Sequence, residues 1–161
     1  MNFLRFLMLL VLSVWLGALI FFPMVAQTSF AALPSSHLAG IVVRGSLIKL
    51  HWMGIGCGII FLACSLIYDR IAIGRTPAVA PSNVAIIFML ALTAISQFMI
   101  IPRMDALRTQ AGEIAALSAD NPIRQSFDSL HAWSTRLESV VLLLGLILLF
   151  MTSRRLTSQR A

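Results

Sequence analysis

Four long runs of apolar residues divide the chain of 161 residues and are separated by shorter, more polar segments. A helix needs roughly 20 apolar residues to cross the hydrocarbon core of a bilayer, and each run has about that length. The first run is longer than the apolar part of a cleaved signal peptide, about 7–15 residues, so we expect it to be retained. The pattern predicts transmembrane helices over about residues 5–27, 49–69, 83–102 and 136–153.

Two apolar stripes at helical spacing continue past the third run and lead into the fourth. They are separated by Asp120-Asn121-Pro122, a typical end and restart of a helix. Helices over about residues 83–118 and 122–153 would each be about 50 Å long, against a hydrocarbon core of about 30 Å. We therefore predict an all-α, single-domain membrane four-helix bundle over residues 1–161. Its third and fourth helices extend beyond the bilayer as an antiparallel hairpin, residues 103–135.

The segments at the ends of the runs predict where helices begin and end. Residues 35–49 mix charged and apolar side chains, which is typical of an interfacial helix or of an amphipathic lead-in to the next span. Pro34 is expected to end the first helix. Ser82 or Asn83 is expected to cap the third helix, because short polar side chains accept hydrogen bonds from its free amides.

Composition excludes a soluble globular domain and places the chain in a membrane. Hydrophobic residues make up 59% of the chain and charged residues only 11%, whereas soluble domains contain about 25% charged residues. The net charge of +6 comes from basic residues at the ends of the apolar runs. That distribution indicates membrane orientation and argues against nucleic-acid binding.

The distribution of basic residues predicts the orientation. The two sides of the membrane would carry equal numbers of basic residues, but the segments on the side of the termini are shorter and so have the higher density. We therefore predict cytoplasmic N- and C-termini, as in a bacterial inner membrane protein, with the hairpin on the other side.

Two histidines are the candidate ligands for a cofactor. His51 begins the second run and His131 precedes the fourth, and each lies close to a tryptophan. One hypothesis is a haem or copper site with both histidines as ligands. Met53 or Cys57, which share one face of their helix, would supply a further ligand. The alternative is an interfacial belt of aromatic and histidine side chains. Because there is no CxxC, HxxxH or Cys/His cluster, no dedicated metal site is predicted.

Other polar residues near the fourth run are expected to be solvated or to pair along the helix. Asp128 can pair with His131 or with Arg124, and Glu138 lies at the interface in this interpretation. Gln97, deep in the third run, is expected to hydrogen-bond to another helix. No pattern combines a nucleophile with a base, so we expect no enzyme activity.

Small residues predict close helix packing. Gly54 and Gly58 are spaced as in GxxxG, which lets another helix approach closely. We expect packing inside the bundle against the first helix around Gly17, with homodimerisation as the alternative.

Three short motifs resemble the transmembrane protein 205-like family, which in bacteria is catalogued as domain of unknown function 4149. The first is Trp15-Leu16-Gly17 followed by Phe21-Phe22, the second is Ile101-Pro102-x-Met104, and the third is Phe127-x-x-Leu130-His131-x-x-Ser134. In the family an Asn commonly follows the third motif, whereas this chain has an acidic residue near that position, Glu138. The resemblance implies a four-helix membrane protein and no particular activity. A looser likeness to copper-resistance membrane proteins with a W-x-G run supports the metal alternative.

Three functions fit these observations. The first is a non-enzymatic structural or accessory protein in the lipid bilayer, whose outer hairpin contacts a membrane-protein partner or a second copy of the chain. The second is a haem- or metal-binding protein that uses His51 and His131. The third is a small transporter or transport accessory.

Overall fold

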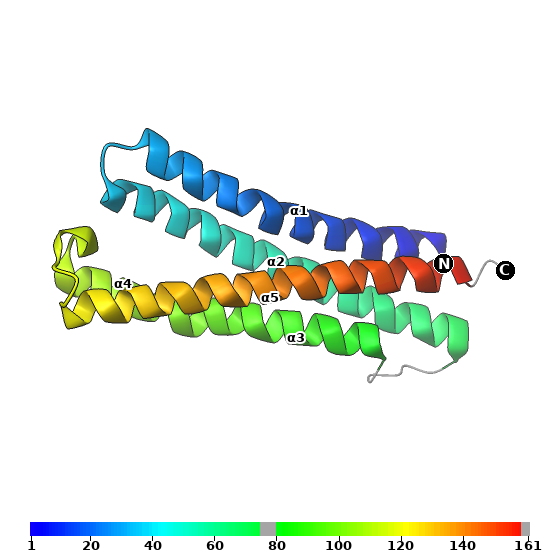
Figure 1. Ribbon diagram of the computed structural model, residues 1–161. Coiled ribbons are helices and arrows are strands. Elements are labelled where there is room, and N and C mark those ends of the chain that lie inside the picture. Colours follow the sequence, from blue (N-terminus) through cyan, green and yellow to red (C-terminus); the bar gives the residue numbers. More distant parts are fainter. Residues whose placement is uncertain (75–79, 159–161) are drawn as a thin grey trace.

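The computed structural model describes residues 1–74 and 80–158, and these residues form helices joined by short turns without any strand. Figure 1 shows the helices side by side in an elongated bundle. In order they are α1 (Asn2–Ala32), α2 (Ser36–Ile73), α3 (Pro81–Ile95), the π-helix η1 (Ser96–Ile100), α4 (Ile101–Ala111), the 3-10 turn η2 (Ile114–Ala116) and α5 (Pro122–Ser158).

The described residues contain four helices that are long and apolar enough to cross a membrane, which confirms the predicted all-α membrane bundle. The segments α3, η1 and α4 run on without a break and together form the third of these helices. Helix α1 packs on α2 and α5, while α3 packs on α2 and α5, so the four helices form a closed ring. We call the end with residues 33–35 and 112–121 the hairpin end.

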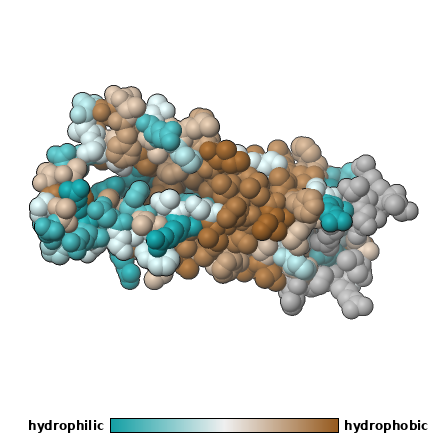
Figure 2. Space-filling view, viewed as in Figure 1, coloured by the Kyte–Doolittle hydropathy of each residue, from teal (hydrophilic) through white to brown (hydrophobic). Residues whose placement is uncertain are grey.

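The surface of the bundle changes in character along its length. Figure 2 shows an apolar band across the middle of the face in view and polar side chains gathered at the hairpin end. Large apolar side chains are exposed on all the long helices, among them Phe21, Ile59, Phe88 and Ile147. Such side chains are stable at a surface that lipid covers, because lipid tails solvate them. The depth of each helix in a bilayer, and with it the projection of residues 103–135, stays a prediction.

The third helix ends earlier than the apolar stripe predicted. We expected it to continue to about residue 118, but α4 ends at Ala111 and residues 114–116 form only a 3-10 turn. Gly112 follows with a φ of +67°, a conformation that glycine adopts readily and that ends a helix. The stripe beyond it contacts α5 and α2 as a turn instead of a helical arm.

Two of the other helix starts lie at polar positions of the sequence, whereas the start of the third helix does not. A single helix begins at residue 36 and includes both the predicted lead-in and the second span. The hydroxyl of Ser35, just before it, accepts a hydrogen bond from the Leu38 amide. Helix α5 begins at Pro122, after the predicted break. The predicted caps of the third helix are wrong. Pro81 begins it, and Ser82 and Asn83 lie buried inside the bundle, where Asn83 accepts a hydrogen bond from Ser65 on α2.

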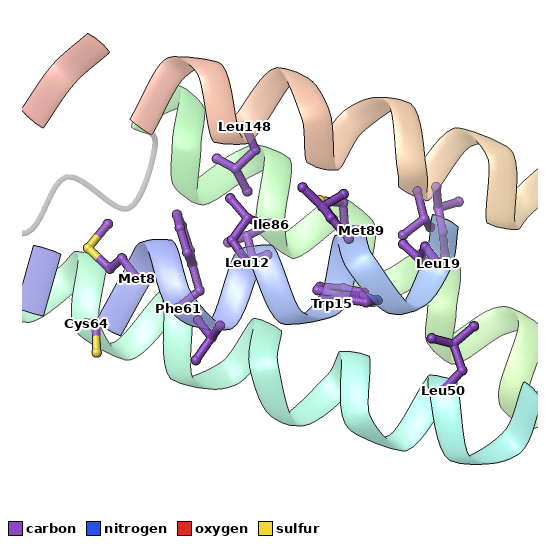
Figure 3. Packing of buried hydrophobic residues seen from close by; sticks show 14 of the residues in the cluster. Met8, Leu12, Trp15, Leu19, Leu50, Phe61, Cys64, Ile86, Met89 and Leu148 are labelled. Atoms are coloured by element: carbon purple, nitrogen blue, oxygen red, sulfur yellow. The ribbon is translucent and has the colours of Figure 1, made fainter. Parts of the chain in front are cut away.

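The core is centred on α1, whose inward face runs from Met8 to Leu19. Trp15 is almost completely buried, and Figure 3 shows it with Met89 of α3 and Leu19 among the side chains that point between the helices. Phe61 and Leu148, also labelled in Figure 3, are equally buried. This packing fixes the rotation of each helix about its axis and therefore decides which polar residues face inward.

Candidate functional site

The imidazole of His51 is a deeply buried ionisable group with a hydrogen-bond partner at each ring nitrogen, and the residue is only 1% exposed. Its Nδ1 lies 2.9 Å from Oε1 of Gln97, and its Nε2 lies 2.6 Å from Oε1 of Glu138. These three residues come from α2, η1 and α5, so the network joins three of the four spans. A buried polar network of this kind is stable only when its members are hydrogen-bonded, as they are here.

The chemistry of the network depends on the Gln97 amide. With Oε1 toward His51, both neighbours present acceptor oxygens to the ring nitrogens. Turning the amide by half a rotation presents its NH₂ group and lets Nδ1 of a neutral ring accept. The two orientations of the Gln97 amide therefore let it act as acceptor or donor toward Nδ1 of His51.

The π-helix η1 places Gln97 in this network. Pro102 lacks an amide hydrogen and its ring crowds the carbonyl four residues earlier, which disturbs a regular α-helix at that point. The extra residue of a π-turn absorbs this disturbance and changes the direction of the side chains before it. Gln97 makes the cross-helix hydrogen bond that we expected from the sequence. The neighbouring Ser96 is buried, and its hydroxyl lies 3.4 Å from that of Ser134 on α5.

Glu138 differs most from its predicted role. The sequence placed it among solvated interfacial residues, but its side chain is only 16% exposed and is bonded to His51. In the same set, Arg124 pairs with Asp128 at 3.9 Å, whereas no described ion pair joins Asp128 to His131. The sequence contains a signal that could have indicated this role. Glu138 lies next to the apolar run of the fourth predicted span, and acidic residues in or beside a span are candidates for a function.

The two candidate ligand histidines occupy different environments. His131 is exposed and lines a cavity, whereas both ring nitrogens of His51 are already in hydrogen bonds. Met53 and Cys57 are partly buried farther along α2. Within residues 1–74 and 80–158 no group of three or more His, Cys, Asp or Glu side chains could hold a metal ion.

A cavity of about 520 Å³ opens beside this network, toward the hairpin end. It lies between α1, α2, α4 and α5, and most of its wall is apolar, with Leu19, Phe22, Leu47 and Leu142 among the lining residues. Glu138 and Ser134 belong to the wall, while His51 lies behind Glu138. A cavity of this size, mainly apolar with a few polar groups, is typical of small-molecule sites.

Charged side chains surround the cavity near the hairpin end. Arg44 on α2 and Asp105 on α4 form a two-bond ion pair that joins these helices. Arg108 also lines the cavity, and its guanidinium lies over the ring of Phe127, with Cζ 5.0 Å from the ring centre. It forms no ion pair with any residue that the structure describes, because the carboxylate of Asp105 is engaged by Arg44.

The predicted packing residues divide into buried and exposed positions. A Cβ atom at Gly54 would collide with the indole of Trp15, and one at Gly58 would lie 2.6 Å from Leu90 Cδ2. Both glycines therefore use their small size inside the bundle. Gly17 is exposed and has open space around its Cα, so it does not take part in this contact.

The remaining motif residues lie in two places. Trp15 belongs to the core, and Pro102 follows the π-turn. Phe127, His131 and Ser134 lie on the cavity side of α5, whereas Leu130 is partly buried outside the lining.

Removing the carboxylate of Glu138 tests the network. We expect Glu138→Ala to lower the free energy of unfolding by about 1–3 kcal/mol, because Nε2 of the buried His51 loses its acceptor. Glu138→Gln should lose less, since an amide oxygen can still accept. Thermal unfolding in mild detergent measures this difference, with Glu113→Ala as a control at an exposed acid. Equal melting temperatures for Glu138→Ala and Glu113→Ala would show that the bond does not stabilise the fold.

Comparison with known proteins identifies one family. The family described as "Domain of unknown function (DUF4149)" matches residues 10–113, which include most of α1 and all of α2, α3, η1 and α4. Trp15, His51, Gln97 and Arg108 lie within the matched segment. The matched segment ends before the Phe127 to Ser134 motif. No curated protein and no solved structure is significantly similar to the chain.

Proposed function

This chain belongs to the DUF4149 family, and we propose that it is a non-enzymatic membrane protein that binds a small amphipathic molecule inside its helical bundle. The observation that supports this most is the cavity of about 520 Å³ next to the buried His51 network. Bundles that only need to be stable fill such space with side chains, because an empty apolar volume forfeits packing contacts. A membrane protein can instead fill it from the surrounding lipid.

The chemistry of the wall supports an amphipathic ligand. Leucine and phenylalanine side chains form its deeper part, where an apolar chain gains dispersion contacts. Arg44, Arg108 and His131 lie near the hairpin end, where a polar group would find donors. The same gradient, apolar in the interior and polar at the interface, is the one that a lipid meets in a bilayer.

The cavity is also open sideways. Its lining includes exposed residues of α1, Pro23 and Gln27, and exposed residues of α5, Thr135 and Ser139. These belong to neighbouring helices of the ring, so the opening lies between α1 and α5. Figure 1 shows α1 diverging from α5 toward the hairpin end. A molecule dissolved in the membrane could enter by this route.

A photoreactive lipid tests the proposal. Phosphatidylglycerol with a diazirine on one acyl chain would be reconstituted with the protein, which would be extracted into detergent before irradiation so that loosely held lipid is lost. We expect the label on Leu19, Phe22, Leu47 or Leu142. Labelling confined to outward-facing residues such as Leu143, Ile147 and Phe150 would overturn the proposal.

For the placement in the membrane we keep the prediction made from the sequence. The higher density of basic residues at the ends near Met1 and residue 154 supports cytoplasmic termini in a bacterial inner membrane.

A cysteine introduced at position 109 tests this orientation. Its thiol should react with a membrane-impermeant reagent from outside intact cells, and reaction only after permeabilisation would reverse the orientation. Contact between the hairpin and a partner protein, and the haem or copper alternative, stay predictions.

A further inference from the structure

Two cavities meet at Arg108. Besides the larger cavity, a smaller one of about 230 Å³ lies at the hairpin end, and both are lined by Phe30, Gly40, Arg108 and Phe127. The smaller cavity is also lined by the donors Ser36, His37 and Arg124 and by the carboxylates of Glu113 and Asp128, so about half of its lining residues are polar or charged. The pair therefore provides a long apolar compartment and a short polar compartment joined at one guanidinium.

Among the residues that the structure describes, Arg108 forms no ion pair at this junction, although the carboxylate of Asp105 acts on its charge without bonding to it. The carboxylate of Asp105 is engaged by Arg44, and Asp128 is paired with Arg124. Glu113 lines the smaller cavity but is exposed and forms no ion pair with Arg108. The Arg108 guanidinium is partly buried against Phe127 and the backbone of Gly40, where a Cβ atom would lie 3.4 Å from Nη2. A cation held in this way is stabilised by an anion that brings its own charge to the site.

We propose that the bound molecule is an anionic phospholipid, with an acyl chain in the larger cavity and its phosphate at Arg108. This rests on the proposed function and adds the charge and class of the ligand. A guanidinium presents several N–H donors in one plane, which matches the oxygens of a phosphodiester. A lipid fits both compartments at once, whereas free phosphate would use only the smaller one.

The position of Arg108 suits a lipid headgroup. It lies seven residues beyond Ile101, one of the last buried apolar residues of the third span, and near its end at Ala111. An apolar chain that starts there can run along Leu47 and Leu142 toward Leu19, between the same helices that leave the lateral opening. The direction of the lipid is thus the same as that of its neighbours in the bilayer.

Native mass spectrometry tests this assignment. The protein would be equilibrated with equal amounts of phosphatidylglycerol and phosphatidylcholine of identical acyl chains, and the retained lipid would be weighed. We expect the wild type to retain phosphatidylglycerol in preference by about fivefold, as one charge pair at a partly exposed site gives. Arg108→Gln should remove the preference and still retain lipid. Arg103→Gln, at an exposed residue outside both cavities, should keep the preference.

Each result has a distinct meaning. Equal retention of the two lipids by the wild type, or an unchanged preference in Arg108→Gln, would overturn the assignment to an anionic lipid and leave the proposed cavity function standing. Failure of the wild type to retain either lipid would contradict the proposed function itself. Displacement of phosphatidylglycerol by millimolar inorganic phosphate would indicate a site for free phosphate and would also overturn the assignment.

Discussion

Replacing Gly54 by leucine is expected to have the largest effect on folding of any single change in the interior. The Cβ atom alone would collide with the indole of Trp15, which is 1% exposed and held on its other sides by the core. Overpacking a filled interior costs about 1–3 kcal/mol and occasionally more, and here the clash is with a rigid ring. Moving α1 and α2 apart would relieve the clash but would lose their packing. Exposing the added leucine to lipid gains little free energy in return, because lipid tails are as apolar as leucine.

Trp15 makes this prediction easy to measure. The environment of its indole changes when α1 and α2 separate. In a background in which the exposed Trp52 and Trp133 are replaced by Phe, tryptophan fluorescence during thermal unfolding in mild detergent therefore reports on this contact. We expect Gly54→Leu to melt far below the wild type or to fail to fold. Gly56→Leu is the matched control, because a Cβ atom at Gly56 meets nothing within 4 Å. If the two variants melted at the same temperature, the packing of α1 on α2 described above would be wrong.

The architecture was predictable because the features that determine it are visible in short stretches of the sequence, without knowledge of the fold. The lengths of the apolar runs determine the number of spans, and Asp120-Asn121-Pro122 marks a helix start whatever surrounds it. The end of α4 was missed for a different reason. The apolar stripe continues past Ala111, but Gly112 adopts a positive φ that a periodicity argument does not take into account.

The site was only partly predictable, because it depends on how each helix is rotated. Gln97 has few possible surroundings deep in a span, so a cross-helix hydrogen bond follows from burial alone. Glu138 and His131 are seven residues apart and so lie on nearly the same face of α5, about 10 Å apart along its axis, and both line the cavity. The sequence cannot tell which of the two lies level with His51, because that also depends on how far α5 is shifted along α2. Core packing decides that Glu138 reaches His51 and that His131 is exposed. The π-turn before Pro102 likewise depends on the tertiary fit.

Filling the cavity is expected to have the largest effect on ligand binding. Val43 lines the cavity on α2, while its neighbour Val42 is 46% exposed on the outside of the bundle. Val43→Phe places a ring where the proposed acyl chain lies, and Val42→Phe places the same ring toward lipid. The two variants have identical composition, so they differ only in where the added volume lies. Their melting temperatures are expected to agree, because the ring of Val43→Phe enters space that is not filled by protein.

Lipid retained by these two variants, weighed by native mass spectrometry after extraction from the same bilayers, tests the central claim most directly. We expect Val42→Phe to carry bound lipid at the wild-type level and Val43→Phe to lose about 90% of it, since a ring in the cavity should cost the chain about 1.4 kcal/mol or more of binding. Equal retention by the two folded variants would show that the cavity between α1, α2, α4 and α5 is not where the protein binds its ligand.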